Sequence, residues 1–346
     1  MKRMLQIDGS RGEGGGQVLR TSLALSMITG TPIRIVNIRA RRSKPGLMRQ
    51  HLTAVQAAAA VSKARVEGAA VGAREITFTP SAVTPGDYHF SIGTAGSTTL
   101  ILQTVLPALI LASGPSQLKL EGGTHNPLAP PFEFLDRAFL PLLQRMGPTV
   151  GVQLNRAGFY PAGGGRLSVT VHPVEKLQGF DLLERGEIQN RRSTVLLANL
   201  PAHIAEREGK KLGELTSWDP LSFEIRHIDA AGPGNAVLLE LESENVTEIF
   251  TAFGEVGVSA EAVAEKAVRE MREYLKAGVP VGEHLADQLL LPLALAGSGS
   301  YRTLPLSLHA RTQVDLIPEF LGVRITVEEE EGGGRRVGVG NAGYRR

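Results

Sequence analysis

The feature that most constrains the fold of this chain is an internal repeat. The segments QTVLPALILASG, from Gln103, and QLLLPLALAG, from Gln288, share a Gln, a Pro four residues later, an apolar run and a closing Gly. The segment RTSLALSMITG, from Arg20, fits the same frame without the Pro. Each run has the length and composition of a buried helix, whose C-terminal caps would be Gly30, Gly114 and Gly297. The sequence therefore predicts three copies of one structural unit.

The residues after each of these helices also repeat. An alternating strand pattern comes next, in PIRIVNIRA, SQLKLEGG and YRTLPLSLH, followed by the irregular loops RRSKPG, THNPLAPP and ARTQ. A second helix is predicted at about 47–62, 132–146 and 312–321. Two short strands then close each copy, EITFTP with DYHFSIG in the first and one from RLSVTVHP in the second. If the copies pack in similar orientations, the three matching loops lie at one end of the sheets, where α/β proteins usually bind ligands.

The spacing of the copies indicates an insertion. Gln103 follows Arg20 by 83 residues, whereas Gln288 follows Gln103 by 185 residues. The additional segment, at 181–279, has its own strands near STVLLANL, FEIRH and AVLLELES and a long helix from about Ser259 to Leu275. We therefore predict an α/β (α+β) fold, with a discontinuous repeat domain of residues 1–180 and 280–346 and a small inserted α+β domain at 181–279.

Composition narrows the classes of function. The 346 residues contain 37 Lys and Arg against 35 Asp and Glu, so any anion site must be local rather than a general basic surface. The chain has no Cys, which excludes disulfides, thiolate metal sites and a Cys nucleophile. The N-terminus lacks the apolar run of a signal peptide, and the most apolar stretch, 98–112, is too short to span a bilayer. We expect a soluble cytoplasmic protein with no membrane segment.

Positive charge is concentrated in one loop, RARRSKPGLMRQH, from Arg39 to His51. Its basic residues, with no acid among them, are Arg39, Arg41, Arg42, Lys44, Arg49 and His51. The planar donors of Arg match phosphate oxygens, so the loop suits a polyphosphate or a nucleic-acid end. The alternatives are a solvated loop or a salt-bridged interface.

Two glycine clusters are candidates for binding loops. In GSRGEGGGQVLR, from Gly9 to Arg20, glycine lets backbone amides approach a ligand, and the start of a helix favours an anion. The spacing matches neither a Walker A motif nor a dinucleotide fingerprint. Glu13 would fit there if a divalent cation joined it to phosphate oxygens, or it could pair with Arg39 or Arg42. We interpret the second cluster, GFYPAGGG (158–165), as a tight turn.

Four of the eight histidines have notable positions. His51, His125 and His309 each follow the repeated strand, and His284 begins the repeated helix of the third copy. A His beside phosphate-binding groups can act as a general base or as a nucleophile toward phosphorus. The sequence has no HExxH spacing for zinc and no GxSxG elbow for a serine hydrolase.

Several of these segments together resemble a known family. GEGGGQVLR, RARRSKPGLMRQHLTAV, GTAGSTTLILQTVLPAL, GGTHNPLAPP, GFYPAGGG and GEHLADQLLLPLALAG are similar to segments of the RNA 3′-terminal phosphate cyclases, and the match runs through essentially the whole chain. The resemblance implies three βαβαββ repeats that form a large domain, with a smaller domain inserted between the second and third. It agrees with the repeat spacing, which does not depend on it.

The resemblance also implies a reaction and its cofactors. ATP would adenylate the catalytic His, which matches His309, with release of pyrophosphate. AMP would then pass to the 3′-phosphate of an RNA, and the adjacent 2′-OH would attack the activated phosphorus to give a 2′,3′-cyclic phosphate. The family uses a divalent cation, Mg or Mn, and the partners are ATP and an RNA 3′-phosphate end.

Residue roles carry over from the family by position. The residues around ATP are Gln103, Pro130, Pro131, His284, Leu285, Ala286, Asp287 and Gln288, with the two prolines near the adenine. Those that handle phosphates and the RNA end are Arg20, Arg39, Arg42, Gln50 and His51. Glu13 matches the carboxylate near the metal and phosphates. Arg20, Gln103 and Gln288 are also the three equivalent positions of the internal repeat, which supports a shared site.

The sequence departs from the family pattern in two places. Thr312 and Gln313 follow the catalytic His where the family usually has Thr-Asn, and the tail EEEEGGGRRVGVGNAGYRR is longer. We interpret the tail as an edge strand with a frayed end. The alternative to an enzyme is a non-catalytic cyclase-like RNA-binding protein of ribosome assembly, which would lack His309. An enolpyruvyl transferase, a third hypothesis, would need six repeats.

Overall fold

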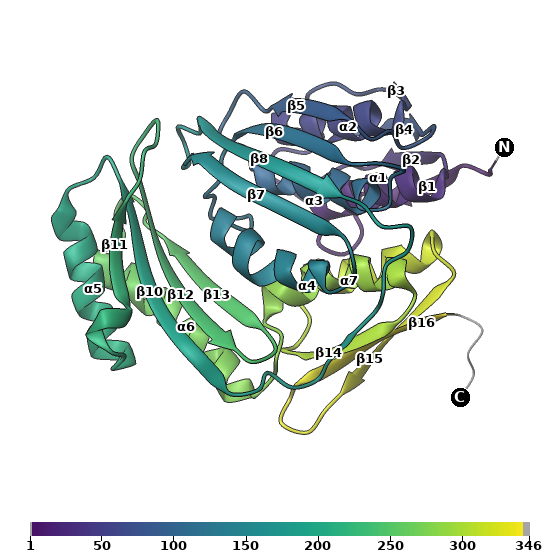
Figure 1. Ribbon diagram of the computed structural model, residues 1–346. Coiled ribbons are helices and arrows are strands. Elements are labelled where there is room, and N and C mark those ends of the chain that lie inside the picture. Colours follow the sequence, from purple (N-terminus) through teal and green to yellow (C-terminus); the bar gives the residue numbers. More distant parts are fainter. Residues whose placement is uncertain (1, 342–346) are drawn as a thin grey trace.

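The computed structural model describes residues 2–341, and three of its four-stranded sheets have one topology (Figure 1). The strands of the first sheet are β1 (Leu5–Asp8), β2 (Ile33–Val36), β4 (Ile76–Thr79) and β3 (Arg65–Glu67), in that order. The second has the order β5 (Asp87–Ser91), β6 (Ser116–Gly122), β8 (Gly165–His172) and β7 (Thr149–Arg156). The third has the order β9 (Asp181–Leu182), β14 (Gly299–Thr303), β16 (Arg335–Asn341) and β15 (Val323–Glu329). In each, the first two strands are parallel and the other neighbours antiparallel.

Each repeat also carries two helical segments. The first of each pair are α1 (Gly16–Thr29), α3 (Thr98–Leu109) and α7 (Glu283–Ala296). The second are α2 (Arg49–Ser62), the π-helix η1 (Phe134–Phe139) continued by α4 (Leu140–Gln144), and α8 (Leu308–Leu316) continued by the 3₁₀ turn η3 (Ile317–Glu319). The predicted α/β (α+β) fold class is confirmed. The first helices are largely buried, as α3 shows, since eleven of its twelve residues are buried.

Four details of the predicted repeat were wrong. DYHFSIG does not close the first copy, because β5 pairs in parallel with β6 and so opens the second. The helix α3 ends at Leu109 with Ile110 as its cap, so Gly114 is not the cap residue, whereas Gly30 and Gly297 are left-handed caps. The tail is not an edge strand, since β16 pairs with both β14 and β15. Its predicted frayed end falls on 342–346, outside the described residues.

The fourth error concerns the third copy, where the second helix was predicted to begin at 312. It begins at Leu308, because the Ser307 hydroxyl accepts a hydrogen bond from Ala310 N at 3.1 Å and caps the helix. The loop predicted at ARTQ is therefore helical. His309 consequently lies in the first turn of α8 rather than in a loop.

The segment between β9 and α7 forms the fourth sheet, ordered β11 (Phe223–His227), β10 (Ile188–Ala198), β12 (Gly234–Ser243) and β13 (Thr247–Phe253). The helices α5 (Ala202–Thr216) and α6 (Ala260–Ala277) cover one face of it, and a 3₁₀ turn, η2 (Pro220–Ser222), precedes β11. The other face, with Leu196, Leu238 and Ile249, packs into the main core beside η1. The division into domains at 181 and 279 stays a prediction. β9, inside the predicted insert, pairs with β14 of the third repeat.

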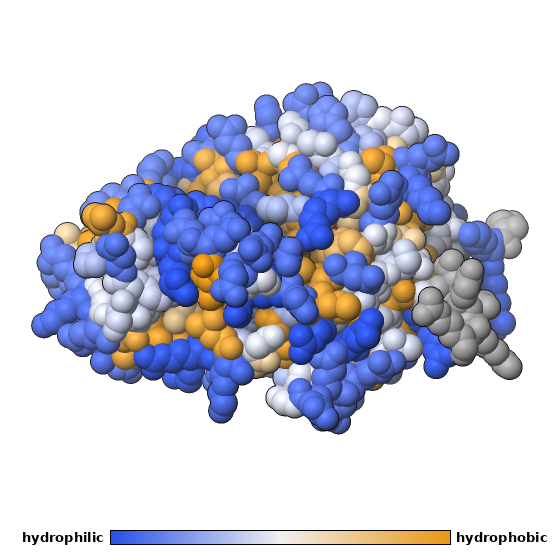
Figure 2. Space-filling model, turned by 60° about the horizontal axis from the view of Figure 1, so that its bottom comes forward, coloured by the Kyte–Doolittle hydropathy of each residue, from blue (hydrophilic) through white to orange (hydrophobic). Residues whose placement is uncertain are grey.

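The surface is largely hydrophilic, with apolar residues exposed in separate patches on the face shown in Figure 2. Within the described range 2–341, no helix combines the length and the apolar character needed to cross a membrane.

Candidate active site

Helices of all three repeats meet at one place. Ser97 N, at the start of α3, donates to Gln50 Oε1 of α2 at 2.6 Å, and α1 contacts α2, α3 and α8. A Cβ added at Gly16, the first residue of α1, would lie 2.7 Å from both Arg20 Nη1 and His51 Nε2. Gly16 therefore allows a guanidinium and an imidazole to approach the backbone. The N-cap amides of α1 and α7 donate to carboxylates, Gly15 N to Glu13 Oε2 at 2.8 Å and Gly282 N to Glu248 Oε1 at 2.5 Å.

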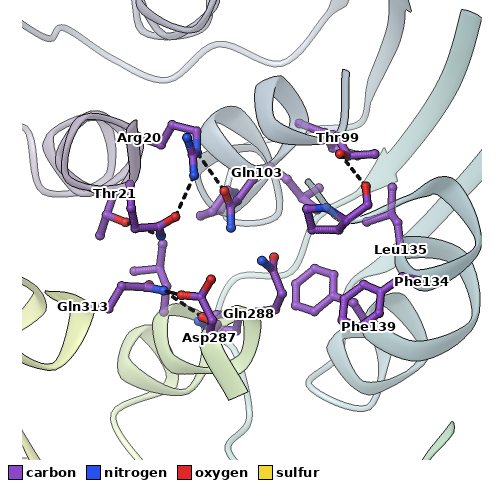
Figure 3. Close-up of a pocket in the computed structure, with 17 residues that line it drawn as sticks. Arg20, Thr21, Thr99, Gln103, Phe134, Leu135, Phe139, Asp287, Gln288 and Gln313 are labelled. Atoms are coloured by element: carbon purple, nitrogen blue, oxygen red, sulfur yellow. Dashed lines mark hydrogen bonds between the residues drawn. The ribbon is translucent and has the colours of Figure 1, made fainter. Parts of the chain in front are cut away.

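A pocket of about 610 Å³, partly open to solvent, lies between these helices (Figure 3). Its polar part holds Arg20, Gln103 and Gln288, the three equivalent positions of the repeat, so these three side chains lie at one pocket. The apolar part is formed by Leu102, Leu106, Pro107, Pro130, Phe134, Leu135, Phe139, Leu291 and Pro292. One wall is thus the π-helix η1, a distortion often found at functional sites. A ligand with a flat apolar group and a charged group would match this division.

Arg20 is held in position by two amide oxygens. Its Nε donates to Gln103 Oε1 at 2.8 Å, and its Nη2 donates to Gln17 Oε1 at 2.7 Å (Figure 3). Gln17 in turn donates from Nε2 to Thr21 Oγ1 at 3.1 Å. Burial lowers the pKa of Arg20 to about 10, so it still carries its positive charge at neutral pH. The site therefore contains a rigidly oriented guanidinium, which leaves Nη1 free to meet an anion near Gly16.

Asp287 is held by Gln313 of the neighbouring helix α8. Gln313 Nε2 donates to the backbone oxygen of Asp287 at 2.8 Å and also to its Oδ1 (Figure 3). Gln313 is 2% exposed and Asp287 lines the pocket. Burial raises the pKa of Asp287, while the nearby positive groups, His309 and Arg20, oppose that rise. The amide of Gln313 thus fixes where this carboxylate lies.

His309 lies one turn before Gln313 on α8, close to Asp287. It is exposed, yet desolvation by the surrounding protein lowers its pKa. The Asp287 carboxylate raises the pKa of His309, and the positive charges of Arg20 and Arg42 lower it. The result is an imidazole that is neutral at neutral pH and has a carboxylate beside it, which is the environment of a nitrogen nucleophile.

Glu13 lies in the loop before α1 and contacts α8, with a side chain that is 6% exposed. One of its oxygens pairs with Arg42, and the other accepts from Gly15 N at 2.8 Å. The Glu13 amide donates to Thr312 Oγ1 at 3.0 Å, which ties this loop to α8. Of the two readings of Glu13, the structure contains the pairing with Arg42. One carboxylate still fits a Mg²⁺ or Mn²⁺ ion that takes its other ligands from phosphates. No group of three or more metal ligands occurs within residues 2–341.

The basic loop is more ordered than its charge suggests. Arg39 has a positive φ of 53°, and its Nη1 donates to the Lys44 and Gly46 carbonyls at 2.8 and 2.9 Å. Part of this guanidinium therefore braces the loop, and burial lowers the pKa of Arg39. His51 accepts from Met48 N at its Nδ1, so its Nε2 carries the proton. Burial and the charge of Arg39 lower the pKa of His51 to about 3, which keeps it neutral.

Four of the eight predicted ATP-site residues do not line the pocket. Leu285 and Ala286 are 0% and 1% exposed and belong to the core, where Ala286 O accepts from Tyr301 Oη at 2.8 Å. His284 is exposed and does not line the pocket, although it lies close enough to lower the pKa of His309. Pro130 lines the pocket, and its carbonyl accepts from Thr99 Oγ1 at 2.8 Å, whereas Pro131 is buried beside it.

Some lining residues were not predicted, notably Gln17, Thr21, Thr99 and the aromatic residues of η1. The signal for Gln17 is its position three residues before Arg20, on the same face of α1. His125 does not line the pocket and instead forms buried hydrogen bonds within the second repeat. It is 1% exposed, its Nε2 lies 2.9 Å from Glu133 Oε2, and its Nδ1 lies 2.8 Å from Thr124 Oγ1.

Comparisons with known proteins agree on one family. The family model described as RNA 3′-terminal phosphate cyclase matches residues 11–327. A protein named RNA 3′-terminal phosphate cyclase from Koribacter versatilis (strain Ellin345) is 54% identical over 329 residues, which is 95% of this chain and 93% of that protein. A protein of the same name from Ectopseudomonas mendocina (strain ymp) is 51% identical over 325 residues, 94% of each chain.

Proposed function

The chain belongs to the family of RNA 3′-terminal phosphate cyclases, and from this premise we propose that it converts an RNA 3′-phosphate end to a 2′,3′-cyclic phosphate with ATP. The observation that carries the proposal is the neutral His309 beside Asp287, a residue that lines a pocket formed by all three repeats. A neutral imidazole has the lone pair that a nucleophile toward phosphorus needs.

In the first step, a ring nitrogen of His309 attacks the α-phosphorus of ATP. A P–N bond forms, the bond to the bridging oxygen breaks, and pyrophosphate leaves. The imidazole becomes cationic as it reacts, and the carboxylate of Asp287 then stabilises the positive charge. Gln313 and Arg20 hold the surrounding charges in place, so little reorganisation is needed during the step.

The pocket suits the two halves of ATP. We assign the adenine to its apolar part, against Phe134, Pro130 and the neighbouring Pro131. The triphosphate would meet Gln103, Gln288 and the guanidinium of Arg20, near the N-terminus of α1. Glu13 would hold a divalent cation together with phosphate oxygens, and the cation would neutralise charge that develops on the leaving pyrophosphate.

The second and third steps involve the RNA end, which we assign to Arg39, Arg42, Gln50 and His51. An oxygen of the 3′-phosphate attacks the adenylate phosphorus, the P–N bond breaks, and His309 is regenerated. The adjacent 2′-OH then attacks the 3′-phosphorus, loses its proton, and expels AMP. A free phosphate monoester has no good leaving group, and AMP supplies one. The attack is intramolecular, so it has a large proximity advantage.

A test of the first step needs only ATP. The protein is incubated with α-labelled ATP and Mg²⁺ or Mn²⁺, and we expect a covalent protein–AMP bond that is labile in acid and stable in alkali. His309→Ala should abolish labelling, and His89→Ala, which removes an exposed His paired with Glu121, should not. Labelling that persists in His309→Ala would refute the assignment of His309.

The same experiment tests the alternative, a non-catalytic RNA-binding relative. Such a protein would bind a 3′-phosphorylated RNA but would give no label under any metal. We also propose a cytoplasmic location for the enzyme, on the ground that its sequence contains no Cys.

A further inference from the structure

One aromatic ring projects from the protein beyond the proposed active site. Tyr160, in the GFYPAGGG loop, is 68% exposed. Within residues 2–341, the other exposed large hydrophobic side chains are aliphatic or Met, and every other Phe, Tyr and Trp is at least partly buried. The pocket and the steps described above do not involve this ring.

The loop that carries Tyr160 is fixed on both sides. Phe159 is 3% exposed and stacks on His125 with ring centroids 5.0 Å apart. Gly163 N donates to Phe159 O at 2.7 Å, and Gly158 O accepts from Thr124 N at 2.8 Å. Because the backbone around Tyr160 is already ordered, a ligand that contacts the ring would lose little conformational entropy from the protein.

The loop lies close to the residues assigned to the RNA end. A Cβ added at Gly163 would lie 2.9 Å from Ala95 Cα, and one added at Gly96 would lie 3.0 Å from Gln50 Cβ. Only this short bridge separates Tyr160 from Gln50. Four steps of about 3.8 Å between successive Cα atoms and the two close approaches make a path of at most about 25 Å. About seven stacked nucleotides, at about 3.4 Å each, cover that distance.

We propose that Tyr160 stacks on a base of the substrate RNA upstream of its 3′-phosphate. The proposal rests on the proposed function, because it takes Gln50 and His51 as the place of the RNA end. An exposed ring on a rigid loop, within about seven nucleotides of the phosphate, presents a π-face that any of the four bases can cover. Stacking of this kind is tolerant of sequence, so Tyr160 adds affinity for single-stranded RNA without specifying a base.

The test measures binding without ATP, so it does not depend on catalysis. A 5′-fluorescent RNA decamer with a 3′-phosphate is titrated with protein and followed by anisotropy. A matched decamer is abasic at every position except the last. We expect Tyr160→Ala to weaken binding of the complete decamer by roughly 5- to 150-fold, and to leave binding of the abasic decamer unchanged. Tyr160→Phe, which keeps the ring, should bind like the wild type.

Leu221→Ala is the matched control. Leu221 is 93% exposed and lies in η2, just before β11. The residues that contact the Tyr160 loop follow the other end of β11, where Ala230 pairs with Ala157. Leu221→Ala should therefore change the affinity for neither RNA. Equal weakening on both RNAs, or none on either, would overturn the proposal, and the second result would suit a surface for a protein partner. Protein–AMP formation by Tyr160→Ala should match the wild type. Loss of that label in the wild type would refute the proposed function alone, because the anisotropy result stands without it.

Discussion

His51 lies in the first turn of α2 and His309 in the first turn of α8, the second helices of the first and third repeats. The topology places them alike, but their surroundings differ. His51 is surrounded by Arg39, Arg20 and Arg42, and burial with these charges lowers its pKa to about 3. The pKa of His309 is lowered by burial too, but the carboxylate of Asp287 counteracts the fall.

The contrast indicates how a repeat can divide a reaction between its copies. An imidazole without an acid nearby cannot accommodate a positive charge, so His51 is suited to donate a hydrogen bond from Nε2. An imidazole beside a carboxylate can become cationic during a reaction, so His309 is suited to form a bond to phosphorus. Asp287, the acid beside His309, lies in α7, so the third repeat contains both the acid and the histidine.

Removal of the acid should make His309 more like His51, and we expect the largest effect here. In Asp287→Asn, the rate of protein–AMP formation should fall roughly 10²-fold, a size typical of losing one preorganised electrostatic group. The pKa of His309 should also fall, since Asp287 is the group that raises it. The imidazole is reactive when neutral, so the low-pH limb of the rate profile should move to lower pH. Rates measured from pH 5 to 9 check both effects.

Asp315→Asn is the control for that experiment, because Asp315 is exposed on the same helix as His309. It should leave the rate and the pH profile unchanged. If Asp287→Asn kept the wild-type rate and limb, the carboxylate would have no part in setting the chemistry of His309.

Substitution of His51 should have a smaller effect, of another kind. His51→Ala should lower the rate of AMP transfer to RNA by roughly tenfold, the upper end for one neutral hydrogen bond, and affect protein–AMP formation less. His51→Gln keeps an N–H donor and should recover most of the loss. Neither variant should alter the pH profile between 5 and 9, because the pKa of His51 is about 3. A profile that changed shape would mean that His51 titrates in this range.

The spacing of the repeat predicted much of this arrangement, because equivalent positions in equivalent helices meet at one place. That is why Arg20, Gln103 and Gln288 line one pocket. The roles assigned to individual residues stay predictions. The sequence could not give the packing of η1 against β13, since no local pattern encodes contacts between segments a hundred residues apart. The start of α8 was available from Ser307, a typical N-cap residue before Leu308, and was missed.

The smallest effect on protein–AMP formation should come from Gln313→Asn. Gln313 holds Asp287, the carboxylate beside His309 that has no counterpart beside His51. Its amide donates to two oxygens of Asp287. In Gln313→Asn, the side chain is shorter by one CH₂, so we expect it to keep only one of the two hydrogen bonds. Protein–AMP formation should slow about threefold, within the range for one lost hydrogen bond.

Gln313→Leu removes both bonds and should slow the step further, yet less than Asp287→Asn, because the carboxylate itself remains. Its low-pH limb should move in the same direction as in Asp287→Asn and by a smaller amount, since a displaced carboxylate still raises the pKa of His309. A merely structural role would lower the amount of folded protein without moving that limb. If the low-pH limb of Gln313→Leu did not move, the orientation of Asp287 by Gln313 would have no effect on the reactivity of His309. The negative charge of Asp287 would then be enough to explain why His309 and His51 differ.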